Sequence, residues 1–541
     1  MNASQLLVKC LENEGVEYIF GVPGEENVLF LDALKKSSSI RYINAVDERG
    51  AAFMAAAYGR FTGKPAVVAT TIGPGALNIP NGLAFASLAG IPLVAITWQT
   101  GLRINGKDGG YQYVDVVSVL KPVVKWQRVI FSPAQMTSVV REAFRVAQSP
   151  KCGPAHIELP EDVAADEVEG NTEPLQVVRN KKSIPDAKVL TRAADSLLNA
   201  IRPIVIAGFR TSDDVVSRAL RSFVESTGIF VISTPMAQGV LPASDPHSLF
   251  SFSSHQRGRL HQAIDRADTI LTIGYSSLEY SPRLWNPQAN LDIIHIDTFP
   301  AKTHSHFDPK IELIGDITTT LGVLEKKLQK RGKWNFNPFR QAREELANGE
   351  MSDASFPVKP QRLVRALRKV ANNAIIVHDN GMHKLWMTRF FHPDKPNQVL
   401  VDNALGSMGS GIPQAIVAKL ANPDKKVLAN VGDGGLLMSL GEIATAISLK
   451  LPIVILVWRD NGYGMIRWHQ EKKGLVPFGV SLTNPNYAEL AESFGGVGFE
   501  VTKTSQLEST IKQALGGNKL SIIDCPVDYS ENIKVFKGRQ V

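Results

Sequence analysis

Two acidic residues, Asp433 and Asp460, are the side chains of this 541-residue chain whose type and spacing point most directly to chemistry. Each lies two residues beyond an apolar run, 427–431 and 453–458, that predicts a buried strand. Open α/β sheets bind ligands at the carboxyl ends of their strands, and Mg²⁺ is held by one or two carboxylates together with substrate phosphates. Asp and Gly are also ordinary turn residues. Two such acids together nevertheless favour a divalent metal that bridges to a diphosphate.

Glycines surround the first of these acids. Gly432, Gly434 and Gly435 flank Asp433, and a residue without a side chain lets backbone amides approach an anion closely. Gly434 and Gly435 are also expected to open a helix, whose amino terminus could face the same diphosphate.

Strand and helix patterns alternate along the whole chain, which predicts the α/β class with doubly wound parallel sheets covered on both faces. Two polar segments interrupt the pattern and are expected to be linkers. The first and third blocks have the same kind of pattern. The expected division is a first domain at 1–165, a linker at 166–184, a central domain at 185–345, a linker at 346–360 and a third domain at 361–541.

The bulk composition is that of a globular protein and excludes several other classes. Apolar residues make up 44% and charged residues 21%, and the net charge of +7 is dispersed rather than gathered in one basic run. This pattern argues against nucleic-acid binding, and no apolar run is long enough to span a membrane. Cys10, Cys152 and Cys525 form no paired motif, and no signal peptide is visible. We therefore expect a cytoplasmic protein.

Five segments spread over most of the chain match one family of enzymes. With these segments, the chain resembles the thiamine-diphosphate enzymes of the acetolactate synthase and pyruvate oxidase family. The resemblance implies a pyrimidine-binding domain, a central domain and a diphosphate-binding domain, in that order. The matching segments are 18–24, 48–60, 73–75, 153–160 and 405–409.

The resemblance also implies a metal site. Asp433 and Asp460 would hold Mg²⁺ together with the main-chain carbonyl of Gly462. The family's usual first-ligand Asn is Asp at position 460, as in the variant of catabolic acetolactate synthases. Asn461 remains the alternative ligand, and Asp460 is favoured.

Glu48 matches the family's catalytic glutamate, which activates the thiazolium carbon of the cofactor through the aminopyrimidine ring. A carboxyl group in an apolar pocket suits that task. The alternative is an ordinary acid at the start of a helix, where a negative charge is favourable. The family's usual neighbour of this glutamate is His, and here it is Asp47.

Other residues match positions that contact the cofactor in the family. Met408 matches the apolar side chain beneath the bent cofactor, although alone it would be assigned to core packing. His383 could donate to a phosphate oxygen or be an ordinary surface histidine. The remaining cofactor-binding candidates are Pro23, Gly24, Gly73, Asn78, Asn380, Gly381, Met382, Gly406, Asn461, Tyr463, Gly464 and Met465.

Gln112 matches a glutamine that lies close to the reacting carbon in acetolactate synthases. Its neighbours differ from the family pattern, with Tyr111 before it and Tyr113 after it. A loop glutamine without a role is the alternative.

The central block distinguishes between subgroups of the family. Residues 271–286 and 527–532 resemble catabolic acetolactate synthases, and the Arg-containing segment of the flavin-binding enzymes is absent after Gly274. Bound FAD is therefore not expected. Arg210 is a possible flavin contact, but a structural role is favoured.

Taken together, the resemblance predicts an acetolactate synthase that condenses two pyruvates to 2-acetolactate with release of CO₂. The cofactors expected are thiamine diphosphate and Mg²⁺. The alternative is another 2-oxoacid decarboxylase or carboligase with the same activation chemistry, similar to benzoylformate decarboxylase or glyoxylate carboligase. The family also implies a homodimer or homotetramer, with each active site between the first block of one subunit and the third block of another.

Overall fold

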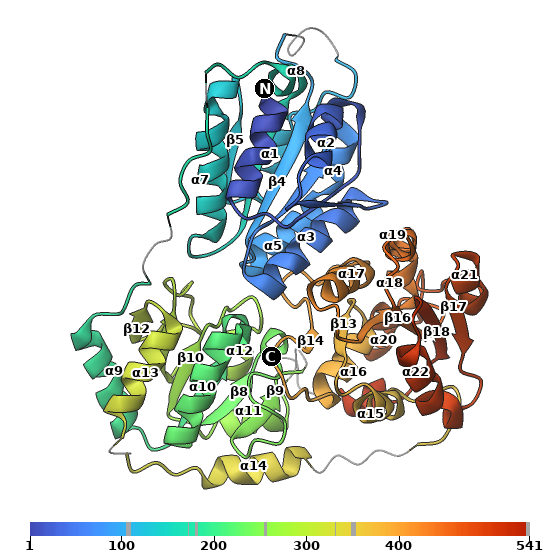
Figure 1. Cartoon of the computed structure of the whole chain (residues 1–541). Helices are drawn as coiled ribbons and strands as arrows, with labels where there is room; N and C mark the ends of the chain where they lie inside the picture. Colours follow the sequence, from blue (N-terminus) through green and yellow to red (C-terminus); the bar gives the residue numbers. More distant parts are fainter. Residues whose placement is uncertain are drawn as a thin grey trace. The chain divides into compact units, whose positions relative to one another are not determined.

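The computed structural model describes residues 1–103, 110–170, 172–178, 182–253, 257–329, 332–347 and 353–536. The described strands form three six-stranded, fully parallel sheets with helices between most consecutive strands (Figure 1). This architecture confirms the predicted fold class. The chain divides into two compact units, one made of 1–180, 412–423 and 439–451, and the other of 181–411, 424–438 and 452–541.

The first sheet has the strand order β2-β1-β3-β4-β6-β5. Its strands are β1 (Tyr18–Gly21), β2 (Arg41–Asn44), β3 (Ala66–Thr70), β4 (Leu93–Gln99), β5 (Trp126–Val129) and β6 (Pro154–Pro160). Its helices are α1 (Ala3–Asn13), α2 (Val28–Lys35), α3 (Glu48–Thr62), α4 (Gly73–Asn78), α5 (Pro80–Ala89), α6 (Val116–Leu120), α7 (Met136–Gln148) and α8 (Glu161–Ala165).

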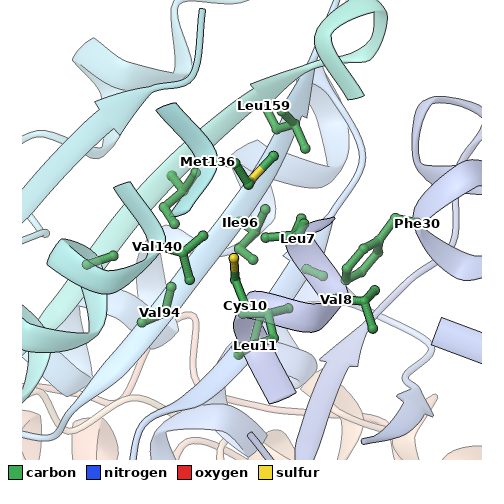
Figure 2. Packing of buried hydrophobic residues seen from close by; sticks show 14 of the residues in the cluster. Leu7, Val8, Cys10, Leu11, Phe30, Val94, Ile96, Met136, Val140 and Leu159 are labelled. Atoms are coloured by element: carbon green, nitrogen blue, oxygen red, sulfur yellow. The ribbon is translucent and has the colours of Figure 1, made fainter. Parts of the chain in front are cut away.

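The core of the first sheet lies between strand β4 and helices α1 and α7 (Figure 2). Leu7 and Leu11 lie one turn apart on α1, as do Met136 and Val140 on α7, so each pair faces Ile96 of β4 from one side of its helix. A capping box, in which Asn2 and Gln5 bond to each other's backbone amides, begins α1.

The central sheet has the order β12-β11-β10-β7-β8-β9. Its strands are β7 (Pro203–Ala207), β8 (Phe230–Ser233), β9 (Ser248–Ser251), β10 (Thr269–Ile273), β11 (Asp292–Asp297) and β12 (Ile311–Ile314). Its helices are α9 (Ala187–Asn199), α10 (Asp214–Thr227), α11 (Arg259–Ile264), α12 (Pro282–Trp285), α13 (Ile317–Lys327) and α14 (Asn337–Ala347).

The third sheet has the order β14-β13-β15-β16-β18-β17. Its strands are β13 (Ile375–His378), β14 (Val399–Leu400), β15 (Val427–Gly432), β16 (Ile453–Arg459), β17 (Val497–Glu500) and β18 (Ser521–Pro526). The helices of this part of the chain are α15 (Pro360–Val370), α16 (Met382–Phe390), α17 (Gly411–Ala421), α18 (Asp433–Met438), α19 (Glu442–Ser448), α20 (Gly464–Lys472), α21 (Tyr487–Ser493), α22 (Leu507–Gly516) and α23 (Asn532–Val535).

The first and third sheets have the same topology. When the strands of each sheet are numbered from its start, both follow the order 2-1-3-4-6-5, whereas the central sheet follows 3-2-1-4-5-6. In the first and third sheets the winding reverses between the first strand and the third strand. Open α/β sheets bind ligands beyond the carboxyl ends of the strands at such a reversal.

The limits of the predicted domains and linkers stay a prediction. Part of each linker, residues 171, 179–181 and 348–352, lies outside the described residues. No helix among the residues that the structure describes is long and apolar enough to cross a membrane.

One close backbone approach in the central sheet gives a testable prediction about the fold. Gly208 follows β7, and a Cβ atom there would overlap the backbone of Gly274 and Tyr275 after β10. We expect Gly208→Ala to lower the free energy of unfolding of this domain by about 1–3 kcal/mol, because the two strands must separate to admit a methyl group. Differential scanning calorimetry measures the change. Gly516→Ala is the control, because a Cβ atom at Gly516 meets nothing within 4 Å. Equal melting of both variants would contradict the packing described.

Candidate active site

Asp433 and Asp460 lie together at the carboxyl edge of the third sheet. Asp433 directly follows β15 as the first residue of α18, and Asp460 directly follows β16. Because β15 and β16 are paired in register from Val427↔Ile453 to Gly432↔Trp458, the two strands end side by side and bring both acids to one place. The structure thus brings together the two acids that the sequence singled out.

The two carboxyl groups are within hydrogen-bonding reach of each other; Asp433 is buried, and the side chain of Asp460 is 9% exposed. Burial and the charge of Asp433 raise the pKa of Asp460, and Arg467 opposes this shift from 3.4 Å away. Two facing carboxylates are unfavourable unless a cation or a proton lies between them.

Asn484 joins this group, although its position in the sequence gave no sign of it. Its side-chain amide donates to Asp433 Oδ2 at 2.8 Å and to Asn461 Oδ1 at 3.0 Å. Tyr487 in turn donates its hydroxyl to Asn484 Oδ1 at 2.9 Å. An Asn-Pro pair such as Asn484–Pro485 is typical of a turn, so the local pattern carried no other signal. Asp433, Asp460, Asn461 and Asn484 are called the third-sheet cluster below.

The donors of the third-sheet cluster fit a magnesium ion that also binds phosphate. Its side chains offer oxygen ligands, which Mg²⁺ prefers. Within the described residues, no group of three or more His, Cys, Asp or Glu side chains could hold a metal ion. A cation between Asp433 and Asp460 would therefore need further oxygen ligands, and a diphosphate supplies them.

The backbone beside these acids is held in unusual conformations. Asn461 has a φ of +54°, a left-handed conformation that asparagine tolerates better than most residues. Its neighbour Gly462 donates its N–H to Asp433 Oδ2 at 3.3 Å, and a side chain at Gly462 would overlap Arg467 and the carbonyl of Val480. The local backbone therefore requires Gly at position 462.

Asp379, which the sequence reasoning missed, organises the segment after β13. It is buried and accepts N–H bonds from Asn380 at 2.8 Å, Gly409 at 3.0 Å and Ser410 at 3.3 Å. Burial nonetheless raises the pKa of Asp379 to about 6. A Cβ atom at Gly435 would overlap this carboxylate, which explains the glycine there.

His383 is a buried histidine rather than a surface one. Its Nε2 lies 3.1 Å from the carbonyl oxygen of Asp379, and burial lowers its pKa to about 3. A Cβ atom at Gly432 would lie 3.4 Å from Nδ1. The imidazole is therefore neutral and packed beside β15, and a bond to phosphate stays a prediction.

Met408 lies at the end of a loop that one carboxylate holds. Asp402 accepts four backbone N–H bonds, at 2.9–3.3 Å, from residues 404–407. Gly406, at φ +70°, lies against the side chain of Asn380. A Cβ atom at Gly434 would lie 3.1 Å from the methyl carbon of Met408 and 2.9 Å from the ring of Tyr463. Met408, Gly434 and Tyr463 therefore meet at one point.

Four further candidates could contribute backbone groups rather than side chains. Met382 is buried in the core of the third sheet, and Met465 packs against the same core. Gly464 begins α20, and a Cβ atom there would lie 2.6 Å from Asp460 Oδ2. Gly381 directly precedes α16. Any ligand contact of Met382 or Met465 would thus come from the amides at the starts of α16 and α20.

In the first sheet, Glu48 is the first residue of α3 and is half-buried. Asn78 donates its side-chain amide to Glu48 Oε2 at 3.0 Å. A Cβ atom at Gly75 would lie 3.0 Å from Oε1, so Gly75 leaves the space beside that oxygen open. One carboxyl oxygen is therefore held by Asn78, and the other lies against Gly75. Asp47, which replaces the family's usual His, has a structural role: it caps α3 by accepting the N–H of Arg49 at 2.7 Å.

The loops after β1 and β3 pack together beside Glu48. A Cβ atom at Gly24 would overlap Thr71, and one at Gly73 would overlap the backbone carbonyl of Gln112. Gln112 has a φ of +58°, a conformation that is sparsely populated by non-glycine residues and clusters at functional sites. Pro23 is in the same turn as Gly24. The structure therefore brings Gln112 to the reversal point of the first sheet. Glu48, Asn78 and Gln112 are called the first-sheet cluster.

Glu442 on α19 supports the position of Glu48, and the sequence reasoning missed it. It is 1% exposed and accepts the N–H of Asp47 at 3.1 Å, the N–H of Val46, and the hydroxyl of Thr445 at 2.7 Å. Burial raises the pKa of Glu442, and these hydrogen bonds oppose the shift. A side chain at Gly50 would overlap the carboxyl group. Glu442 thus fixes the backbone from which α3 begins.

Removal of the Glu442 carboxyl group should destabilise the start of α3. Glu442→Ala leaves two amide N–H groups without their acceptor, so we expect a loss of about 1–3 kcal/mol of stability and faster amide exchange at residues 44–50. Hydrogen–deuterium exchange read by mass spectrometry checks this expectation. Glu442→Gln keeps an acceptor oxygen and should exchange much more slowly than the alanine variant. Identical exchange in wild type and Glu442→Ala would refute the supporting role.

Comparison with known proteins agrees with this geometry. Three family descriptions match the chain: "Thiamine pyrophosphate enzyme, N-terminal TPP binding domain" at 1–119, the "central domain" at 190–324 and the "C-terminal TPP binding domain" at 353–525.

Named relatives match over nearly the full length. An acetolactate synthase of Bacillus subtilis (strain 168) is 33% identical, covering 99% of this chain and 95% of the relative. A catabolic acetolactate synthase of Raoultella terrigena is also 33% identical, covering 98% and 96%. The acetolactate synthase isozyme 1 large subunit of Escherichia coli (strain K12) is 29% identical, covering 98% and 94%. The resemblance inferred from the motifs is thereby confirmed, and this chain belongs to the thiamine-diphosphate-dependent enzymes of the acetolactate synthase type.

Proposed function

We propose that this enzyme condenses two molecules of pyruvate to 2-acetolactate and releases one CO₂. The observation that carries the proposal is the third-sheet cluster, in which Asp433 and Asp460 face each other at the carboxyl edge of the sheet. The names of the full-length relatives support the choice of reaction within the family.

The residues of the two clusters have distinct proposed tasks. Bound thiamine diphosphate would supply the carbon nucleophile that adds to a 2-oxo acid and accepts the charge left by CO₂. Glu48 would hold a proton at Oε1, while the bond from Asn78 fixes Oε2. Gln112 would orient the substrate, because its strained backbone and its packing on Gly73 restrict where its side chain can reach.

The third-sheet cluster would bind the charged end of the cofactor. Asp433, Asp460 and the carbonyl of Gly462 would hold Mg²⁺, and Asn484 keeps Asp433 oriented. Of the two candidates at 460 and 461, Asp460 is favoured because its carboxyl group is buried beside Asp433, whereas the Asn461 amide oxygen accepts from Asn484. The Met408 side chain, next to Gly434 and Tyr463, would support the bend between the two rings of the cofactor.

A flavin is not part of the proposal. The winding of the central sheet reverses between β7 and β10, where this topology would bind a dinucleotide. There the backbones after the two strands touch at Gly208 and Gly274, and the Arg210 guanidinium bonds to the fully buried Asp297, with Nε 2.7 Å from Oδ1. This packing supports a structural role for Arg210 and a reaction without FAD.

A product assay tests the reaction. We expect the enzyme, given pyruvate, thiamine diphosphate and Mg²⁺ without added flavin, to form acetolactate with one CO₂ released for every two pyruvates consumed. The addition of FAD should leave the rate unchanged. Acetaldehyde as the only product, with one CO₂ for each pyruvate, would reassign the enzyme to the decarboxylases. The absence of both products would show that another 2-oxo acid is the substrate and would implicate Gln112 and its neighbours.

The proposed assembly is a homodimer or homotetramer in which Glu48 of one subunit and Asp433 of another serve the same site. Complementation tests this arrangement. Glu48→Gln should keep cofactor binding and Asp433→Ala should lose it, and each change alone should lower activity by at least about 100-fold. If the two variants are mixed as unfolded chains and refolded together, roughly a quarter of wild-type activity should return, because half of the dimers are hybrids with one intact site.

The control is a mixture of Glu48→Gln with the double variant Glu48→Gln/Asp433→Ala, in which no intact site can form. If the first mixture stays as inactive as this control, the two residues act within one chain and the proposed assembly is wrong.

A further inference from the structure

Five arginines converge on a large cavity that the proposed function does not use. The cavity has a volume of about 1190 Å³ and is lined by residues of the central and third sheets and their helices. The arginines come from α11, α14, α15 and α16: they are Arg259, Arg343, Arg365, Arg368 and Arg389.

This cavity lies away from the third-sheet cluster. Asn372 and Gln398, which line it, precede β13 and β14 and therefore mark the amino edge of the third sheet. Asp433 and Asp460 follow β15 and β16 at the opposite, carboxyl edge. A ligand in the cavity would not compete with one at the carboxyl edge.

One face of α15 forms a wall of the cavity. Arg365 and Arg368 are three residues apart and thus lie on the same side of the helix, and both are exposed. Cations are common in the last turn of a helix, which would account for Arg368 alone. That preference does not explain why Arg259 and Arg389, which belong to two other helices, line the same cavity.

These arginines lack the partners that other arginines of the chain have. Arg141, Arg210 and Arg459 form ion pairs with buried or half-buried acids. In the described ranges, by contrast, none of the five cavity arginines forms an ion pair with a carboxylate. Two lysines in the lining, Lys369 and Lys534, do have acidic partners.

The positive charge of these arginines lowers the pKa of neighbouring basic groups. The pKa of Arg389 is lowered by burial and by the charge of Arg259. Burial lowers the pKa of His392, on the cavity wall, to about 3, and Arg368 and Arg343 contribute to that shift. Two acids, Glu345 and Asp394, also line the cavity, and Asp245 acts to raise the pKa of Arg343, but these carboxylates offset only part of the charge of five arginines.

Two of the guanidinium groups are already held in place. Arg343 Nη2 donates to the carbonyl of Ala243 at 2.9 Å, and its guanidinium lies 5.1 Å from the ring centre of Phe250. That ring stacks on His392 with centres 4.2 Å apart. Phe250 has a φ of +65°, which is rare for a bulky residue and is maintained only where its surroundings require it. Arg389 Nη1 donates to the carbonyl of Val535 at 2.7 Å. Both contacts orient a cation without neutralising it.

We propose that this cavity binds a small polyphosphate anion, either free or as the phosphate tail of a nucleotide. Guanidinium groups bind phosphate oxygens through paired, charge-assisted hydrogen bonds, and several of them together match a multiply charged anion. The cavity, at about 1190 Å³, has room for such an anion with bound water or for a whole nucleotide. The inference is independent of the reaction proposed above.

Calorimetric titration tests the proposal. Inorganic triphosphate is titrated into the enzyme, saturated with thiamine diphosphate and with Mg²⁺ fixed in excess throughout. We expect saturable binding of one anion per chain, weakened at least tenfold in Arg365→Ala/Arg368→Ala and also weakened in Arg259→Ala. The control Arg192→Ala/Arg218→Ala removes the same charge from two exposed positions on α9 and α10 and should bind as wild type does.

A parallel titration with ATP separates the two sources of phosphate. If ATP binds with the same affinity as triphosphate, only the phosphates are recognised. If ATP binds more tightly, the cavity is a nucleotide site. Either result supports the proposal. Failure of wild type to bind either anion would overturn it, as would equal weakening in the control variant. If wild type binds no anion and the α15 variant sediments as a smaller assembly, the arginines contact another subunit and the proposal is wrong.

Discussion

The pair of buried carboxyl groups at Asp433 and Asp460 is the constraint on which the rest of the third sheet depends. Two acids that share such a site must be compensated, because burial and the charge of Asp433 both raise the pKa of Asp460. The protein supplies only part of the compensation, through Arg467 and the Asn484 amide. Binding of a cation with a diphosphate would therefore stabilise the folded third sheet as well as equip it for chemistry.

Sheet topology explains why the candidate residues gather where they do. In the first and third sheets, the segments after the first and third strands meet at the reversal of winding. Gly24 packs on Thr71 there in the first sheet, and Asp379 meets Gly435 in the third. The central sheet has the other winding, and its reversal point is filled by backbone contact and by the Arg210–Asp297 pair. The reversal points therefore differ in content: candidate site residues lie there in the first and third sheets, and a backbone contact with an ion pair lies there in the central sheet.

The sequence predicted the fold class and the meeting of Asp433 with Asp460, because apolar runs followed by Asp and Gly are local signals. It did not reveal Asn484 or Glu442. Asn484 occurs in an ordinary turn sequence, and Glu442 in an ordinary helix. Their importance comes from partners far along the chain, such as the amide of Asp47 for Glu442. No window of sequence contains both partners, so such residues become visible only when the chain is folded. The burial of His383, which rules out the alternative of an ordinary surface histidine, was likewise not visible in the sequence.

The link through Glu442 bears on how the two clusters are related. Helix α18, which begins at Asp433, is followed directly by α19, which begins at Glu442. Glu442 holds the backbone just before Glu48, while Asp433 belongs to the third-sheet cluster. Residues 433–442 thus include Asp433 of the third-sheet cluster and Glu442, which supports the first-sheet cluster. A substitution within residues 433–442 can therefore affect either cluster, and its position decides which: Asp433 acts in the third-sheet cluster, and Glu442 acts on the backbone from which α3 begins.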